Sequence, residues 1–236
     1  QLSKAAGPLG VTEIGATLDM DKAIVHRILK TLEEARLVRQ DPSTKRYSLG
    51  IGFLQLGGRF LHQLRLPELS HPHLLELWER SNETVHLCVQ SDLQTVLVRV
   101  YESRQGVRVS ASVGEKASLH GTSSGKVFLA FGPADLLERS IASGLTRHQP
   151  KTITDPELLR AEVDQVKRQG FATDIEESDL NYSALAVPVM GRRGECAAAI
   201  AVALPVGRMS PKPSAKLLGY LQEAASAISQ ELLHAG

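Results

Sequence analysis

The sequence predicts an α+β protein in two parts, on three observations. Residues 9–50 carry two short helical patterns followed by two short strands, and residues 84–113 alternate apolar and polar side chains as antiparallel strands do. Residues 122–169 return to helical spacing, and a strand hairpin and a long helical pattern end the chain. With 236 residues, the chain is long enough for one large domain or two small ones.

Composition is typical of a globular protein, with 42% hydrophobic and 22% charged residues. The aromatic content of 4% argues against an RNA surface that stacks bases. Cys88 and Cys196 lie in apolar runs and are expected to be reduced core thiols, as in a cytosolic protein. The longest apolar run, residues 196–206, is too short to span a bilayer, and the first residues lack the apolar core of a signal peptide. We therefore expect a cytoplasmic protein with no membrane contact.

Charge is distributed unevenly along the chain. Residues 1–66 carry a net charge of +4, whereas the remaining residues carry −3. A small basic segment joined to a larger acidic one is typical of a nucleic-acid-binding module attached to a separate domain.

Residues 9–50 predict a helix-turn-helix followed by a wing. Thr12 can cap a helix that runs to about Leu18, and Asp21, after a tight turn, can cap a second helix that runs to about Ala35. Two short strands around a basic turn then predict the hairpin wing. Apolar residues recur in the second helix at steps of three and four and predict its buried face: Ile24, Val25, Ile28, Leu29, Leu32 and Ala35.

The opposite face of the second helix is basic at its start and acidic at its end. A recognition helix enters the major groove with its N-terminal part, where carboxylates would be repelled by phosphate. We expect Lys22, His26 and Arg27 to read or position the DNA. Lys30, together with the two residues at the wing tip, is expected to contact phosphate or the minor groove. The full DNA-binding set that we predict, with the two residues of the wing tip at its end, is Lys22, Ala23, His26, Arg27, Lys30, Lys45 and Arg46.

Residues 1–50 are therefore predicted to be a winged helix-turn-helix that binds double-stranded DNA. The simpler alternative is a solvated amphipathic helix followed by a hairpin. The first helix of such a domain should precede Gly7, so we expect the chain to be trimmed or disordered at its start.

Residues 51–66 predict a linker helix, and residues 67–236 a second domain of α+β type. Gly57 and Gly58 weaken the linker helix in isolation. The second domain opens with an amphipathic segment, residues 68–80. Its other predicted elements are strands at 84–90, 95–102 and 107–113, helices at 122–131, 133–142 and 156–169 (with a capping box from Thr154 to Glu157), a closing hairpin at 184–190 and 195–204, and a long helix at 211–233.

The stretch GTSSGKV, residues 121–127, is similar to a phosphate-binding loop but departs from it twice. The spacer between its glycines is one residue short, and Val127 stands where the loop needs a hydroxyl that binds magnesium. We therefore exclude an NTPase and predict the start of a helix, with Thr122 or Ser123 as its cap.

Several segments together resemble the IclR family of bacterial transcriptional regulators. They are LDMDKAIVHRILKTLEEARLVRQDPSTKRYSLG, ETVHL, SVGEKASLHGTSSGKVFLA, TITDPELL and GFATDIEESDLNYSALAVPV, in that order along nearly the whole chain. The resemblance implies a winged helix-turn-helix joined by a linker helix to a GAF-like effector-binding domain. It also implies homodimers, often homotetramers, that bind palindromic operators as repressors or activators. No cofactor is expected.

The resemblance also implies an effector pocket at the start of the helix that GTSSGKV opens. A helix start offers free N–H groups and the positive end of a dipole, which suit the carboxylate of a small organic acid. Residues 109 and 111 share one face of the predicted strand at 107–113, and we expect them to form the floor of the pocket. The predicted effector-binding residues are Val109, Ala111, Leu119, Ser123, Ser124, Asp174, Tyr182 and Ala184.

Other roles remain open for these residues. The two serines can act only as helix caps, Asp174 can be a turn residue and Tyr182 can pack in the core. Lys126 can reach an anion, stay solvated, or pair with Glu176 or Glu177. His86, Cys88 and His120 lack the second tight ligand pair of a metal site, and His71 and His73 at a helix start are expected to be solvated.

An enzyme is the competing interpretation from another class. Ser124, His120 and Asp174 could form a hydrolase triad, but the sequence has no G-x-S-x-G elbow. A hydrolase would turn over generic esters, whereas a sensor would only bind its ligand. A scaffold that does not bind DNA would show no salt-sensitive affinity for it.

Overall fold

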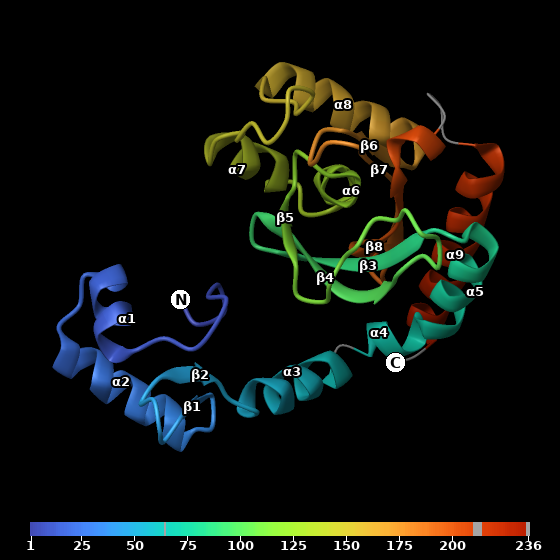
Figure 1. The fold of residues 1–236 in the computed structure, drawn as a ribbon. Helices are drawn as coiled ribbons and strands as arrows, with labels where there is room; N and C mark the ends of the chain where they lie inside the picture. The colour runs from blue at the N-terminus through green and yellow to red at the C-terminus, as the bar shows by residue number, and fades with distance from the viewer. Residues whose placement is uncertain (64, 210–213, 235–236) are drawn as a thin grey trace. The chain divides into compact units, whose positions relative to one another are not determined.

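The computed structural model describes residues 1–63, 65–209 and 214–234, apart from the side chains of residues 60–63. The chain divides into two compact units, Gln1–Leu64 and Arg65–Gly236 (Figure 1). The predicted linker helix, residues 51–66, falls in the first unit apart from residues 65 and 66, which belong to the second.

The first unit is a helix-turn-helix followed by a two-stranded wing, as predicted. Its five elements are α1 (Val11–Leu18), α2 (Lys22–Glu34), β1 (Val38–Gln40), β2 (Tyr47–Leu49) and α3 (Gly52–Gln63). The strands β1 and β2 pair antiparallel. The small core comes from α1, α2 and both strands: Ile14, Val25, Leu29, Val38 and Tyr47.

Two details of the first unit differ from prediction. Thr12 does not cap α1, because Gly10 precedes the helix and its N–H donates to the Glu13 carboxylate at 2.8 Å. Ala35 is exposed just after the end of α2. Ile24 and Ile28 are not core residues either, since their exposed fractions are 42% and 44%. Each stands one position before a core residue of α2, and one position turns a side chain by about 100° around a helix.

The second unit is a six-stranded antiparallel sheet with helices on both faces. The strand order is β5-β4-β3-β8-β7-β6. Its strands are β3 (Thr84–Ser91), β4 (Gln94–Tyr101), β5 (Lys116–Ser118), β6 (Ala172–Ile175), β7 (Tyr182–Met190) and β8 (Cys196–Pro205). Its helices are α4 (Leu66–Leu69), α5 (His71–Ser81), α6 (Ser123–Phe131), α7 (Leu136–Ala142), α8 (Pro156–Gln169) and α9 (Ala215–His234), with a 3-10 turn, η1, at Val206–Arg208.

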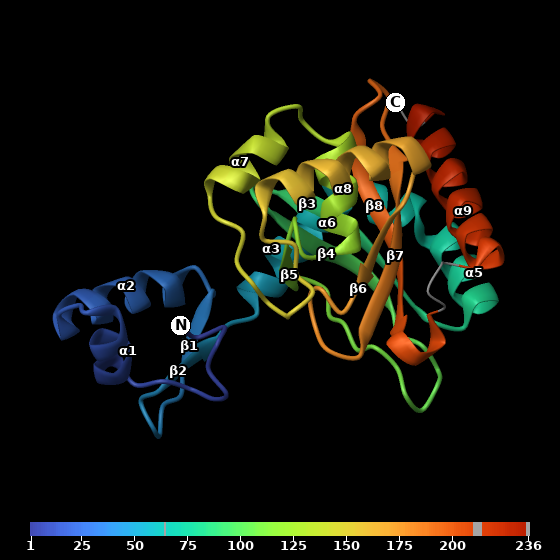
Figure 2. The same ribbon diagram turned by 90° about the horizontal axis from the view of Figure 1, so that it is seen from above.

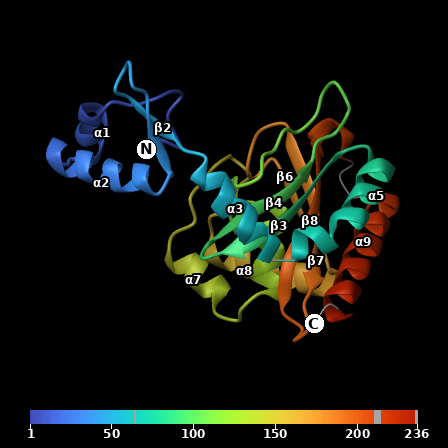
Figure 3. The same cartoon turned by 90° about the horizontal axis from the view of Figure 1, so that it is seen from below.

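The helices form one layer on each face of this sheet. Figure 2 shows α6 against one face with α8 beyond it, and α6 packs on β7, β8 and α8. Figure 3 shows α5 and α9 side by side on the opposite face, where α9 packs on β7. Helix α6 is enclosed between the sheet and α8, and every residue from Ser123 to Ala130 is buried.

The prediction of a strand at residues 107–113 was wrong. This segment is irregular, and β5, a few residues later, takes the edge position beside β4. Side chains bind its backbone in place of a neighbouring strand: the Thr84 hydroxyl donates to the Val109 carbonyl at 2.6 Å, and the Ala111 N–H donates to the Glu102 carboxylate at 3.4 Å.

Helix boundaries follow local caps that the sequence showed only in part. The cap of α8 is Asp155, not Thr154, and its carboxylate accepts the N–H groups of Glu157 and Leu158 at 2.8 and 3.0 Å. Helix α7 begins at Leu136, three residues later than predicted. The segment 68–80 is split at Ser70 between α4 and α5, and strand β6 was not predicted. Residues 211–213 of the long predicted helix lie outside the described residues.

Candidate DNA-binding and ligand-binding sites

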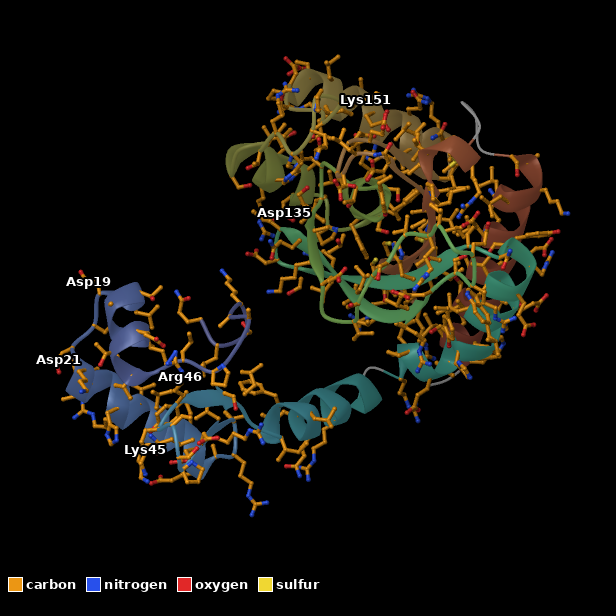
Figure 4. The ribbon with its side chains drawn as sticks, in the orientation of Figure 1. Asp19, Asp21, Lys45, Arg46, Asp135 and Lys151 are labelled. Atoms are coloured by element: carbon orange, nitrogen blue, oxygen red, sulfur yellow. The ribbon has the colours of Figure 1, made fainter. Side chains whose placement is uncertain are left out.

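The first turn of α2 presents the predicted recognition residues to solvent. Asp21 caps the helix by accepting the Ala23 N–H at 2.7 Å, as predicted. Figure 4 shows Asp19 and Asp21 on the turn that sets α2 against α1. The five predicted residues of this helix are all exposed: Lys22, Ala23, His26, Arg27 and Lys30.

The turn of the wing is held by Asp41. Its carboxylate accepts the N–H groups of Ser43 and Thr44, both at 2.8 Å. The Ser43 hydroxyl and these N–H groups stabilise the charged form, so the pKa of Asp41 falls to about 2. Lys45 follows in the turn with φ of 56° and is exposed.

Arg46 joins the wing to α1. Its Nη2 lies 2.7 and 2.8 Å from the two carboxylate oxygens of Glu13, and its Nε donates to the Pro8 carbonyl at 3.0 Å. Figure 4 labels Lys45 and Arg46 on the wing. A DNA phosphate that binds Arg46 would have to share its guanidinium with Glu13, whereas Lys45 is exposed to solvent. The contacts of Lys45 and Arg46 with DNA remain predictions.

A cavity of about 480 Å³ lies between the sheet and the start of α6 in the second unit. Strands β3, β4, β5, β7 and β8 contribute to its walls, as do the irregular segment 107–111 and residues 178–181. This volume is within the range of small-molecule sites. Its lining residues include His86, Cys88, Thr95, Leu97, Arg108, Val109, Ala111, Lys116, Thr122, Ser123, Ser124, Ser178, Asn181 and Tyr182.

The GTSSGKV stretch starts α6 at the wall of this cavity. Thr122 is the N-cap, and its hydroxyl accepts the Gly125 N–H at 3.1 Å. Ser123 and Ser124 follow on the first turn, where N–H groups have no acceptor within the helix. Both serines are buried and line the cavity. Thr122 is therefore the cap of α6, and neither serine has that role.

Five of the eight predicted effector-binding residues line the cavity: Val109, Ala111, Ser123, Ser124 and Tyr182. The other three, Leu119, Asp174 and Ala184, are buried next to it and are absent from its wall. The backbone of Leu119 packs against Gly125 of α6, and Ala184 lies in β7 opposite Asp174 of β6.

Asp174 holds the loop that closes one side of the cavity. Its carboxylate accepts the Glu177 N–H at 2.9 Å and also binds the N–H and hydroxyl of Ser178. Burial raises the pKa of Asp174, and these hydrogen bonds oppose the shift. Asp174 is fully buried, and its hydrogen bonds hold residues 177 and 178 in place. Ser178 in turn lines the cavity.

Lys126 is buried beneath this loop and paired with two carboxylates. Its Nζ lies 2.7 Å from Glu177 and 3.0 Å from Glu162, and its side chain is only 1% exposed. Burial works to lower the pKa of Lys126, but the charges of both glutamates outweigh it and raise the pKa. Of the alternatives, pairing with Glu177 is confirmed and a solvated lysine is wrong; Glu176 pairs with Lys151 at 2.8 Å instead. Figure 4 labels Lys151.

Among the described residues, the structure brings together neither the proposed metal ligands nor the proposed hydrolase triad. His86 and Cys88 line the cavity, but the Nε2 of His120 lies 2.9 Å from the Thr146 carbonyl instead of joining them. Across the described ranges, no cluster of three or more His, Cys, Asp or Glu could hold a metal ion. Of the proposed triad, the Ser124 oxygen accepts from Cys88 and Asp174 binds Ser178, so no base is set against the serine.

Of the two histidines at the start of α5, His71 is exposed, as expected, and His73 is half-buried; both contact other side chains. The Nδ1 of His71 meets the Tyr101 hydroxyl, and the Nε2 of His73 lies 2.7 Å from Glu231. None of the helices in the described ranges combines the length and apolar character that crossing a bilayer requires.

The residues of β3 and β4 that line the cavity were not predicted from the sequence to bind the effector. His86 and Cys88 alternate on β3, Thr95 and Leu97 alternate on β4, and all four line the cavity. Their period of two marks one face of a sheet, but the sequence does not show which face carries the cavity. Arg108 and Lys116 were missed because their positions depend on the irregular course of residues 107–115.

Comparison with known proteins gives matches over both units. The model described as "Bacterial transcriptional regulator IclR C-terminal" matches residues 58–230, and "IclR helix-turn-helix domain" matches residues 1–42. The HTH-type transcriptional repressor AllR of Klebsiella pneumoniae is 29% identical over 98% of this chain and 85% of its own length.

Solved structures have the same fold. The crystal structure of Thermotoga maritima IclR matches with a TM-score of 0.79 at 27% identity, over 98% of this chain and 94% of that one. An IclR homologue from Microbacterium hydrocarbonoxydans, complexed with 4-hydroxybenzoate, matches with a TM-score of 0.83 at 24% identity, over 97% and 92% of the two chains.

Proposed function

We propose that this chain, which belongs to the IclR family of bacterial transcriptional regulators, binds a palindromic operator through α2 and the wing and a small organic acid in the cavity at α6. Its first unit is a DNA-binding helix-turn-helix and its second an effector-binding domain. The family consists of transcription regulators and not of enzymes, so we set the hydrolase alternative aside. The proposal includes a homodimer or homotetramer that acts in the bacterial cytoplasm, where its operator lies.

The operator proposal rests on the exposed, basic first turns of α2. Arg27 points away from the core, since it lies about half a turn around the helix from Val25 and Leu29. An arginine in the major groove can donate two hydrogen bonds to guanine, and each such pair discriminates between bases.

Arg27→Ala is expected to weaken operator binding by about 1–3 kcal/mol and random-duplex binding much less. Fluorescence anisotropy with an operator taken from upstream of the protein's own gene, at two salt concentrations, measures both. Arg168→Ala, which removes an exposed arginine of α8 in the second unit, is the control and should change neither. Equal losses on operator and random DNA would make Arg27 a phosphate contact.

One observation supports an organic acid as the ligand: the first turn of α6 lies in the wall of the cavity. Its first N–H groups and the positive end of its dipole favour a carboxylate. Ser123 and Ser124 are small enough for a ligand to approach the backbone. The homologue complexed with 4-hydroxybenzoate supports the same class of ligand.

Ser123→Leu is expected to abolish the response to effector while operator binding without effector is kept. The leucine fills the space in front of the helix start, and we expect the effector concentration at half response to rise about 100-fold or more, as for loss of a charge-assisted contact. Anisotropy of the operator complex, titrated with acids, measures it. Ser143→Leu, at an exposed helix end, is the control. Loss of operator binding as well would indicate a folding role for Ser123.

A further inference from the structure

His86 is a buried polar side chain of the cavity that lacks a hydrogen-bond partner. It lies on β3, 6% exposed, and it lines the cavity together with Cys88 two residues later. Its Nδ1 is fully buried without a hydrogen-bond partner. Its Nε2 is not fully buried, and it forms no hydrogen bond with the described residues. Buried polar side chains nearly always have a hydrogen-bond partner, so the ring of His86 is unusual in keeping an unused nitrogen, Nε2, in the wall of a cavity.

The imidazole of His86 is neutral at pH 7. Burial lowers the pKa of His86 to about 4, so the ring carries one N–H donor and one acceptor nitrogen. Because Nδ1 is closed off, Nε2 is the nitrogen that a molecule in the cavity can reach. Among backbone groups, an unpaired buried N–H is rarer than an unpaired buried acceptor; by the same reasoning, we assign the proton to Nε2 and leave the buried Nδ1 as the acceptor. His86 therefore presents an N–H donor to the cavity.

His86, Cys88 and Leu97 form an uncharged part of the cavity wall. Burial raises the pKa of Cys88 to about 12, so its thiol is neutral, and it donates to the Ser124 oxygen at 3.5 Å. Leu97, opposite Cys88 on β4, is apolar. Arg108 and Lys116 also line the cavity, on segment 107–111 and β5, and can serve a charged group. The neutral imidazole of His86 offers one N–H and no charge, which suits a hydroxyl or carbonyl oxygen.

We propose that the effector carries a second, uncharged oxygen, a hydroxyl or a carbonyl, and that His86 selects it by donating a hydrogen bond to that oxygen. This inference rests on the proposed function, in which the start of α6 holds the effector carboxylate. The α6 start and His86 then recognise two separate groups of one small molecule. His86 is a specificity-determining residue for a hydroxy or oxo acid.

The test compares acids that differ only by a hydroxyl and a methyl group of similar size. Three pairs span a range of lengths: lactate and isobutyrate, 3-hydroxybutyrate and 3-methylbutyrate, and 4-hydroxybenzoate and 4-methylbenzoate. Isothermal titration calorimetry with the full chain gives the dissociation constant of each. For at least one pair, we expect the hydroxy acid to bind about tenfold or more tightly than its methyl partner, as one buried hydrogen bond predicts.

His86→Leu is expected to remove this preference, so that the two acids of the pair bind within about threefold of each other. The ring has no hydrogen bond to lose in the free protein, so an apolar replacement should leave the fold intact; circular dichroism checks this. His73→Leu is the matched control, since His73 lies on α5 and pairs with Glu231. It should keep the tenfold preference.

The outcomes separate this inference from the proposed function. Binding of acids without a hydroxyl preference in any pair would overturn the role of His86 and leave the acid-binding function standing. A preference that persists in His86→Leu would do the same. If none of the six acids binds, both the acid-binding function and the role of His86 are overturned.

Discussion

Lys126→Met is expected to lower the free energy of unfolding of the second unit by about 3–5 kcal/mol. The methionine keeps most of the packing volume but removes the positive charge. The Glu177 carboxylate is then buried without a cation, and its Oε2 already lacks a partner. Burial of an unpaired charge is one of the few single changes that costs this much. Urea unfolding followed by circular dichroism measures the loss.

A double variant distinguishes the lost ion pair from lost packing. Lys126→Met combined with Glu177→Gln leaves no unpaired charge at Glu177, and we expect about half or more of the stability to return, since apolar replacement of a buried pair is often close to neutral. Glu162 remains partly exposed and can turn to solvent. Lys167→Met, at an exposed position of α8, should change stability by less than about 0.5 kcal/mol. A loss below about 1 kcal/mol in Lys126→Met would contradict a charged, buried lysine.

The same pair connects stability to the ligand site. Glu177 immediately precedes Ser178, which lines the cavity, and Lys126 is on the second turn of the helix whose first turn carries Ser123 and Ser124. Asp174 fixes the loop from its other side through Ser178. The Lys126–Glu177 ion pair therefore holds the cavity loop against the helix that we propose binds the effector carboxylate. Lys126→Met should for this reason also weaken effector binding.

Local signals explain which elements could be predicted from the sequence. The cap at Asp21, the period of α2 and the basic hairpin turn all depend on neighbours in the chain, and the structure has all three. The exposure of Ile24 and Ile28 could not be predicted. Each is next to another apolar residue, and the sequence does not show which residue of each pair faces the core. The segment 107–113 alternates like a strand but lies beside Thr84 and Glu102, which take its backbone hydrogen bonds.

The ligand site was predictable in part for the same reason. GTSSGKV identifies a helix start by itself, and the family resemblance gave that start a role. The contacts of Lys126 with Glu162 and Glu177 span 36 and 51 residues, so no local pattern shows them. A strand at Asp174 was not predicted, because β6 has only four residues and is a strand only through its pairing with β7.

Gly125→Ala is expected to lower the free energy of unfolding by about 3 kcal/mol, the upper part of the range for overpacking a core. A Cβ at this position would lie 2.2 Å from the Leu119 carbonyl oxygen and 2.4 Å from the Leu119 Cα. These are backbone atoms of the segment that leads into α6, so no side-chain rotation relieves the clash. Alanine otherwise favours a helix over glycine by about 1 kcal/mol, so a net loss would show that the close approach outweighs helix propensity.

Gly219→Ala is the matched control for this substitution. Gly219 is in α9 of the same unit, and a Cβ there meets nothing within 4 Å. Without a clash, only propensity acts, and stability should rise by about 0.5–1 kcal/mol. Opposite signs for the two variants in urea unfolding would establish that α6 is seated on the Leu119 backbone. Because this contact sets where Ser124 stands in the cavity wall, Gly125→Ala should also weaken binding of the acids. Equal gains in stability would mean that α6 can shift, and that the position of its first turn is not fixed by this contact.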